Sequence, residues 1–121
     1  MAWTYEVRTR NFYLNGTYQF TALYSGAPGY KNDSSQECVA DRGPLPRGTY
    51  TISEPFYHPH AKAWTLRLTP SVSNHMCGRG GFLIHGDSVK RPGTASNGCI
   101  ITSFSDRKKI SSSHDHTLIV E

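Results

Sequence analysis

A histidine and a cysteine, each next to a glycine, stand close together in the last third of the chain. Residues 82–101 read FLIHGDSVKRPGTASNGCII, so that His85 ends one apolar run and Cys99 begins another. A cysteine attacks a carbonyl carbon as its thiolate, and a neighbouring imidazole can take the thiol proton. Gly98 permits a tight turn with positive φ, and such a turn can point backbone N–H groups at a developing oxyanion. These residue types in this order indicate acyl transfer by Cys99, with His85 as the base.

Each of these residues, taken singly, also fits a structural role. Cys99 begins an apolar run, and buried free cysteines commonly pack as small hydrophobic residues. His85 fits a half-buried histidine, and Gly98 fits an ordinary turn residue. The chemical interpretation therefore depends on all three occurring together.

The elements that would position these residues are mainly β-strands. Apolar and polar residues alternate with a period of two along several short segments, as is typical of half-buried strands. Asn15-Gly16 predicts a hairpin turn, and Ser103 with Asp106 predicts the start of a short helix over residues 104–111. Residues 25–46, rich in glycine and proline, predict a long connection. We expect strands over residues 3–7, 12–14, 18–24 (with Tyr18, Phe20, Ala22 and Tyr24 on one face), 49–53, 63–69, 82–85, 99–101 and 117–120.

Length and composition fit one globular domain. The chain has 121 residues, of which 36% are hydrophobic, 12% aromatic and 18% charged. This is enough for one core and excludes a disordered tail. No apolar run has the length of a transmembrane helix, and residues 1–10 lack the apolar stretch of a secretory signal. We expect a single domain over residues 1–121, either cytoplasmic or exported without cleavage by a dedicated machine.

The net charge of +4 is distributed unevenly. Between residues 79 and 109, six basic residues accompany two acidic ones, and the resulting field would attract an anionic ligand. Nucleic acid and a carboxylate-rich substrate are both candidates, and a solvated basic face is the structural alternative. The basic residues are Arg79, Lys90, Arg91, Arg107, Lys108 and Lys109.

The chain has three cysteines. An odd number fits neither a complete disulfide framework nor a zinc site with four cysteines. We expect one disulfide, between Cys38 and Cys77, because Cys99 has the chemical use described above. Three reduced thiols are the alternative.

Two separated motifs resemble those of the L,D-transpeptidases, the YkuD-type catalytic domain. His85-Gly86 followed by Ser96-Asn97-Gly98-Cys99-Ile100 resembles the family signature of His-Gly, a variable loop and Ser-His-Gly-Cys-Ile-Arg. Upstream, residues 43–52 (GPLPRGTYTI) resemble the family's Pro-x-Gly-x-Tyr/Phe-x-Ile strand beside the substrate groove. Such matches are hypotheses that geometry must confirm. The resemblance implies a small, mainly β domain, a β-sandwich or sheet with one short helix.

The resemblance also implies a peptidoglycan tetrapeptide stem as substrate and no cofactor. Cys99 would attack the carbonyl of the third residue, and His85 would act as base and then protonate the departing D-alanine. The Gly86 carbonyl would orient the imidazole, and the N–H groups of Gly98 and Cys99 would hold the oxyanion. Water, a free D-amino acid or a neighbouring stem would then resolve the acyl-enzyme by hydrolysis, exchange or crosslinking.

Two positions depart from the family pattern. Asn97 stands where many members have a histidine, and Ile101 stands where many have an arginine. Asparagine cannot titrate, so a second base is lost there. We expect Ser96 mainly to hold the loop, and charge from flanking loops to replace the arginine. The expected substrate-binding residues are Ser96, Asn97, Asp87, Arg79 and Arg91, with Lys90 as a further source of positive charge.

The small size, the missing signal and the Gly-Asp pair after His85 make the chain similar to the type VI secretion L,D-transpeptidase effectors. This resemblance implies an antibacterial toxin that is secreted without a signal peptide and acts in the periplasm of the target bacterium. It also implies a cognate immunity protein. An oxidising destination would explain a Cys38–Cys77 disulfide. We expect a monomer that neither binds nucleic acid nor inserts into a membrane.

Three other interpretations remain open. In a papain-like cysteine amidase the nucleophile precedes the histidine, and only His114 and His116 follow Cys99 here. His58-Pro59-His60 and His114-Asp115-His116 offer donors suited to zinc. A non-catalytic module would grip nucleic acid or cell wall through the basic segment, although that segment lacks a pattern of stacking aromatic residues.

Overall fold

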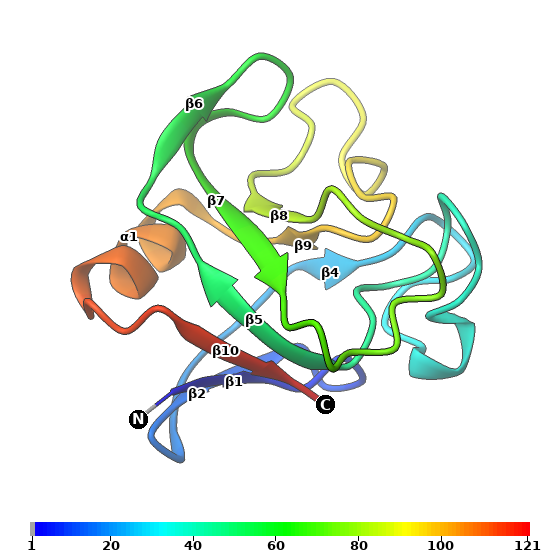
Figure 1. Cartoon of the computed structure of the whole chain (residues 1–121). Helices are drawn as coiled ribbons and strands as arrows, with labels where there is room; N and C mark the ends of the chain where they lie inside the picture. Colours follow the sequence, from blue (N-terminus) through cyan, green and yellow to red (C-terminus); the bar gives the residue numbers. More distant parts are fainter. Residues whose placement is uncertain (1) are drawn as a thin grey trace.

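One long strand, β7 (Lys62–Pro70), is shared by two groups of strands (Figure 1). The computed structural model describes residues 2–121. Strand β7 pairs antiparallel with β5 in one group and with β8 in the other, and β6 (Phe56–His58) is a further antiparallel partner. The strands run in the order β3-β2-β1-β10-β5-β7-β8-β9-β4. Their bounds are β1 Trp3–Tyr5, β2 Asn11–Leu14, β3 Thr17–Thr21, β4 Tyr24–Ser25, β5 Gly48–Ile52, β8 Leu83–His85, β9 Ile100–Ile101 and β10 Thr117–Val120.

The turn between β2 and β3 is formed by Asn15 and Gly16, as predicted. Both have positive φ, 51° and 83°, which a type I′ turn requires and which asparagine and glycine tolerate best. The strands leave the turn antiparallel, with Leu14 opposite Thr17.

The predicted strand over residues 18–24 is divided, and the expectation that Tyr18 shares the buried face is wrong. Phe12 pairs with Phe20 but Tyr13 pairs with Tyr18, so the register shifts by one residue. Such a bulge reverses the alternation of side chains. Tyr18 is therefore 54% exposed, whereas Phe20 is 6% exposed. Tyr24 then begins β4 in the other group of strands, where it pairs with Ile101.

The helix α1 (Phe104–Ser112) extends one residue beyond the prediction. The Ser103 side chain caps it by accepting a hydrogen bond from the backbone N–H of Asp106, as predicted. The helix packs against β7 and β8 and buries Arg107 and Ile110. Within residues 2–121, no helix is long and apolar enough to cross a membrane.

A single hydrophobic cluster joins both groups of strands and the helix. Phe12 and Phe20 stack with ring centroids 4.7 Å apart, and burial of each such ring stabilises the fold by roughly 1.5–3 kcal/mol. The same cluster contains Ile84 and Ile100, which are fully buried, and Ile110 of the helix. The strands that carry the predicted site are thus anchored in the core. The fold is mainly β with one short helix, as expected.

Cys38 and Cys77 form a disulfide, as expected, and Cys99 is a free cysteine. The disulfide ties the connection after the 3-10 helix η1 (Ser34–Gln36) to the loop between β7 and β8. The two cysteines are 39 residues apart, and closing a loop of that length stabilises the fold by about 4 kcal/mol in the chain-entropy model.

Strand β6 was not predicted from the sequence. Only the turn that follows it, at Pro59, has a clear signal. A strand of three residues is too short to show a period of two. Its pairing with β7 produces a hairpin that projects beside the site described next.

Candidate active site

His85 and Cys99 lie near each other because β8 and β9 are parallel neighbours. The register pairs Ile84 with Ile100 and His85 with Ile101, so Cys99 stands directly before β9. Side chains alternate between the two faces of a sheet. Ile84 and Ile100 occupy the core face, and His85 and Cys99 therefore project from the other.

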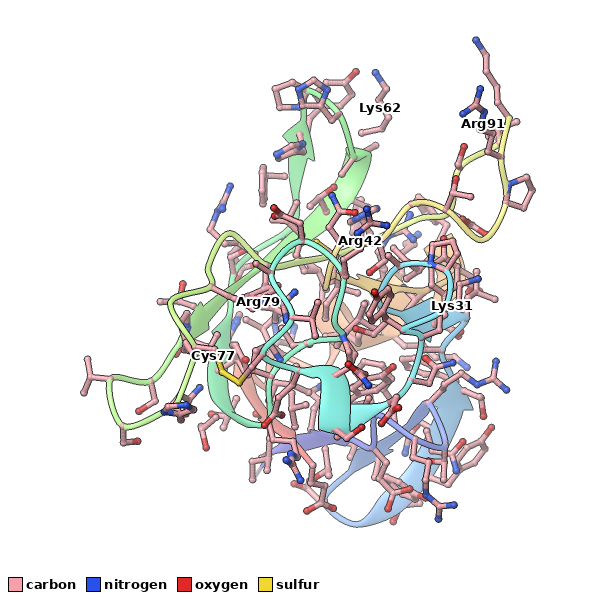
Figure 2. All side chains as sticks on the ribbon, turned by 90° about the vertical axis from the view of Figure 1, so that its right-hand side faces the viewer. Lys31, Arg42, Lys62, Cys77, Arg79 and Arg91 are labelled. Atoms are coloured by element: carbon pink, nitrogen blue, oxygen red, sulfur yellow. A yellow bond between two sulfur atoms is a disulfide. The ribbon has the colours of Figure 1, made fainter. Side chains whose placement is uncertain are left out.

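Both side chains line a cavity of about 1100 Å³. Two projecting segments flank it, the β6–β7 hairpin and the loop after β8. Figure 2 shows Lys62 at the tip of the first and Arg91 at the tip of the second, on the same side of the molecule. The lining also includes His58, His60, Lys62, Phe82, Leu83, Gly86 and Lys90.

The imidazole of His85 is held in one orientation. Its Nδ1 atom lies 2.8 Å from the carbonyl oxygen of Gly86. A carbonyl only accepts, so Nδ1 carries the proton and Nε2 remains an acceptor. Burial lowers the pKa of His85, the hydrogen bond to Gly86 opposes this, and the charge of Arg107 lowers the pKa further. The imidazole is thus neutral at pH 7, as a general base requires.

The Cys99 thiol is half-buried beside β8. Its Sγ atom accepts a hydrogen bond from the backbone N–H of Leu83 at 3.3 Å. Burial raises the pKa of Cys99, and the Leu83 hydrogen bond and the charge of Arg79 offset part of that rise. The resting pair is a neutral thiol and a neutral imidazole, so proton transfer would accompany attack instead of preceding it.

Ser96 organises the turn that precedes Cys99. Its Oγ donates to the Cys99 carbonyl at 2.6 Å and accepts from the N–H groups of Gly98 at 3.0 Å and Gly26 at 2.9 Å. These are the loop-holding hydrogen bonds expected of Ser96. They correct the expectation for Gly98, because its N–H is committed to Ser96 and is not free to hold an oxyanion. Among residues 2–121, the Cys99 N–H donates to no other residue outside the strand ladders, and it lies within hydrogen-bonding reach of its own Sγ.

Gly98 is required by its conformation and by its neighbours. Its φ is +138°, and an added Cβ would lie 2.5 Å from Cε1 of Phe82 and 2.7 Å from Nη2 of Arg79. A side chain at this position would be strained and would collide with both residues. The turn therefore depends on close packing against Phe82 and Arg79.

Sequence analysis missed Ser25, which orients the peptide between Gly98 and Cys99. The fully buried Ser25 donates its hydroxyl to the Gly98 carbonyl at 3.0 Å and accepts the Leu45 N–H at 3.0 Å. The carbonyl and the N–H of a trans peptide point in opposite directions, and none of the described peptides is cis. Anchoring the Gly98 carbonyl thus turns the Cys99 N–H away from Ser25. Ser25 is 73 residues from Gly98 in sequence, so no local pattern marks it.

Arg107 of α1 was expected only as part of a basic patch, but it is 6% exposed and lines the cavity. Its side chain donates to the carbonyls of Trp64, at 2.9 Å, and Thr102. A Cβ on Gly86 would lie 3.2 Å from its Nη1 atom. Trp64 has a φ of 58°, which is rare for a bulky residue. The charge of Arg107 lowers the pKa of His85, a contribution that sequence analysis did not anticipate.

Arg79 and Asp87 also line the cavity, but other parts of the protein occupy their polar groups. The terminal nitrogens of Arg79 donate to the carbonyls of Glu37, Gly43, Pro44 and Asn97. The Asp87 carboxylate accepts from the Tyr24 hydroxyl at 2.6 Å and from the N–H groups of Ser88 and Gly93. Both side chains therefore hold loops of the cavity wall, and their expected contact with the substrate stays a prediction.

The two remaining expected substrate contacts differ in position. The exposed Asn97 lines the cavity, whereas Arg91 stands outside its lining (Figure 2). Lys90, next to Arg91, does line it. The positive charge of the loop after β8 therefore reaches the cavity through Lys90.

Two of the histidines of the alternative interpretations, His58 and His116, are hydrogen-bonded within the protein. His58 Nδ1 accepts the backbone N–H groups of His60 and Ala61, each at 3.1 Å. His116 Nδ1 lies 2.8 Å from the Ile52 carbonyl, and neither His114 nor His116 lines the cavity. In the described part of the chain, the side chains with metal-ligand spacing are Cys38, His75 and Cys77, whose two sulfurs are bonded to each other.

The chain is similar in sequence or in structure to several known proteins. The family model of the Tlde1 domain matches residues 19–118. The structure is similar to an L,D-transpeptidase from Stackebrandtia nassauensis, with 16% sequence identity, a TM-score of 0.59, and coverage of 99% of this chain and 54% of that chain. An L,D-transpeptidase from Mycobacterium smegmatis has 18% identity, a TM-score of 0.55, and coverage of 99% and 58%.

The helical cell shape determining protein Pgp2 from Campylobacter jejuni has 18% identity, a TM-score of 0.63, and coverage of 99% and 46%. The chain thus spans about half the length of these solved structures, and the likeness concerns the fold. No curated protein matches the sequence.

Proposed function

Because this chain belongs to the Tlde1 domain family and has an L,D-transpeptidase-like fold, we propose that it is a cysteine acyltransferase acting on peptidoglycan tetrapeptide stems. One observation carries the proposal. His85 and Cys99 line the same cavity, and the Gly86 carbonyl leaves Nε2 of His85 unprotonated. A thiol that can give up a proton and an imidazole that can accept it therefore line the same accessible cavity.

The acylation step follows from these groups. Cys99 Sγ attacks the carbonyl carbon of the third stem residue while its proton passes to Nε2 of His85. The Cys99 N–H, which donates to no backbone carbonyl outside the strand ladders among residues 2–121, donates to the oxyanion. Collapse of the tetrahedral intermediate breaks the bond to the terminal D-alanine, whose amine takes the proton back from His85. The product is a thioester on Cys99 and free D-alanine.

The acyl-enzyme is resolved by a second nucleophile, which again gives its proton to His85. Water yields a tripeptide stem, a free D-amino acid yields an exchanged tetrapeptide, and the amine of another stem yields a crosslink. Hydrolysis and exchange fit an antibacterial protein best, because both remove or alter the donor stems. We therefore place L,D-carboxypeptidase and D-amino acid exchange before crosslinking.

Two cationic side chains would hold the carboxylates of the stem. Lys62 from the β6–β7 hairpin and Lys90 from the opposite loop both line the cavity and are exposed. Charge-assisted hydrogen bonds from an ammonium group favour such an anion. The only acidic residues in the cavity lining are Asp41 and Asp87, and Asp87 is already hydrogen-bonded within its loop.

The biological setting that we propose is a type VI secretion effector that acts in the periplasm of a rival bacterium, with a cognate immunity protein in the producing cell. Membership of the Tlde1 domain family supports it. The Cys38–Cys77 disulfide is consistent with an oxidising destination.

Mass spectrometry of muropeptides tests the chemistry. The purified protein is incubated with tetrapeptide-rich peptidoglycan, with and without D-methionine. We expect tripeptides, and tetrapeptides carrying D-methionine, from the wild type. Cys99→Ala and His85→Gln should give neither product. Unchanged tetrapeptides from folded wild-type protein would refute the proposed substrate.

A further inference from the structure

Arg79 donates hydrogen bonds to four backbone carbonyls beside the cavity. Its Nη1 atom donates to the carbonyls of Glu37 and Pro44, and its Nη2 atom donates to those of Gly43, at 3.0 Å, and Asn97, at 2.8 Å. Three of these carbonyls belong to the connection between η1 and β5, and the fourth belongs to the turn before Cys99. Arg79 therefore links two segments that are far apart in sequence.

The link to Asn97 determines how one peptide of the catalytic turn is oriented. The carbonyl of the Asn97–Gly98 peptide points to Arg79, and its N–H points to Ser96 Oγ at 3.0 Å. A planar trans peptide clamped at both ends cannot rotate. The following peptide carries the Cys99 N–H, the proposed oxyanion donor. Its direction depends on Gly98, against which Arg79 Nη2 is packed.

The segment that carries Arg79 has little rigidity of its own. Residues 77–81 read Cys-Gly-Arg-Gly-Gly, and glycine-rich segments lose more conformational entropy on ordering than others. The disulfide enters two residues before Arg79, at Cys77. Its other end, Cys38, is next to Glu37, whose carbonyl accepts from Arg79. Figure 2 shows the disulfide at Cys77 and the Arg79 side chain on the same loop, facing the neighbouring connection.

We propose that Arg79 is a positioning residue that holds the Asn97–Cys99 turn in its catalytic form, and that the Cys38–Cys77 disulfide is what keeps Arg79 there. The enzyme is consequently fully active only when oxidised. This inference rests on the proposed function, since it concerns the oxyanion donor of that reaction. A reduced chain would keep its nucleophile and base but would hold the turn loosely.

The redox step is an ordinary thiol–disulfide exchange. A small disulfide oxidant, such as oxidised glutathione, accepts two electrons from the thiols of Cys38 and Cys77. Their sulfurs become bonded, and their two protons leave on the two thiols of reduced glutathione. Cys99 takes no part, because its sulfur is not bonded to another in the structure.

The test separates acyl transfer from thiol reactivity. We measure kcat for D-methionine exchange, and the rate of Cys99 alkylation by iodoacetamide, which needs no oxyanion donor. Arg79→Lys keeps the positive charge beside Cys99 but cannot serve four carbonyls. We expect kcat to fall by about 10²-fold, the usual effect of losing one oxyanion donor, while alkylation changes less than about 3-fold. Arg8→Lys, an exposed arginine of the β1–β2 connection, is the matched control and should keep its kcat.

A second pair of variants tests the disulfide. In Cys38→Ser/Cys77→Ser, Cys99 is the single thiol. We again expect kcat for exchange to fall by about 10²-fold, while the rate of Cys99 alkylation changes less than about 3-fold. Adding Arg79→Lys to this variant should lower kcat by a further factor of less than about 3, because the effects of changing coupled groups are not additive. Circular dichroism checks that each variant is folded. Arg79→Lys retains the disulfide and therefore tests the positioning role of Arg79 even if the serine variant does not fold.

Several results would overturn the inference. An Arg79→Lys enzyme with wild-type kcat would remove the positioning role. Multiplicative losses in the triple variant would show that Arg79 and the disulfide act independently, and equal losses of exchange and alkylation would indicate general disorder. Absence of both hydrolysis and exchange by oxidised wild type is a different result, because it would refute the proposed function itself.

Discussion

The Nδ1 atom of His85 lies 2.8 Å from the carbonyl oxygen of Gly86, the next residue in the chain. This contact selects the tautomer in which Nε2 is free to accept a proton. A buried imidazole so oriented is neutral and needs no neighbouring carboxylate to hold it. The backbone carbonyl directly after β8 therefore orients the imidazole, as a third side chain does in a catalytic triad.

The pH dependence of kcat/KM should be broad. Burial lowers the pKa of His85 from its ordinary value of 6.5, so the base stays unprotonated, and the enzyme active, to pH values below 6.5. Burial raises the pKa of Cys99 above its ordinary 9.0, so no thiolate forms at rest in the neutral range. We expect an acid limb centred below pH 6.5, a plateau, and iodoacetamide alkylation that accelerates only in the alkaline range. Fast alkylation at pH 6, with an acid limb near pH 4, would instead indicate a preformed ion pair.

Arg107→Met should move the acid limb of kcat/KM to higher pH. The groups that face His85 are Arg107 from α1, His58 from β6 and Asp87 from the following loop. The Arg107 charge opposes protonation of His85, so its removal raises the pKa of His85. The variant should also lose about 1–3 kcal/mol of stability, because the carbonyls of Trp64 and Thr102 lose their donor. Arg107→Lys keeps the charge and should leave the acid limb in place, and an unmoved limb in Arg107→Met would contradict the electrostatic role.

Ser25→Ala should reduce both stability and kcat. The change leaves the Leu45 N–H and the Gly98 carbonyl without their buried partner, which costs about 1–3 kcal/mol. It also releases the peptide that directs the Cys99 N–H, so kcat should fall more than KM rises. Urea unfolding and steady-state kinetics measure the two effects. Ser73→Ala, at an exposed position, is the control, and wild-type kcat in Ser25→Ala would show that the peptide keeps its direction without the hydroxyl.

Asp87→Asn should weaken the loop after β8 and change how stability depends on pH. Burial raises the pKa of Asp87, but hydrogen bonds from Tyr24, Gly93 and Ser88 outweigh it and hold the pKa below its ordinary 3.8. The fold therefore favours the carboxylate, and this contribution is present above pH 3.8 and lost as the pH falls through the folded-state value. Thermal melts between pH 2 and pH 7 should show a lower Tm for Asp87→Asn at neutral pH and convergence with wild type at low pH. Parallel melting curves would argue against an ionised anchor.

Local patterns in the sequence were enough to locate several elements. Asn15-Gly16 predicted the hairpin, and Ser103 with Asp106 predicted the start of α1, because turns and helix caps are decided by residues that are neighbours in the chain. The resemblance of the segment from His85 to Ile100 to a known signature identified the pair that lines the cavity. The prediction for Tyr18 was wrong, because a one-residue β-bulge breaks the alternation of side chains and the sequence pattern does not show where a bulge occurs.

Only the tertiary structure decided which residues surround His85 and Cys99. Ser25 and Gly98 are 73 residues apart, and Arg79 and Glu37 are 42 apart, yet both contacts shape the turn before Cys99. Nothing in the sequence distinguished the roles of the basic residues between 79 and 109. In the structure, packing of α1 buries Arg107, and Arg79 in the loop after Cys77 donates to backbone carbonyls. The physical reason is that the sequence specifies residue types and their local conformations. Which polar group satisfies which distant partner is determined only when the strands assemble and water is excluded from between them.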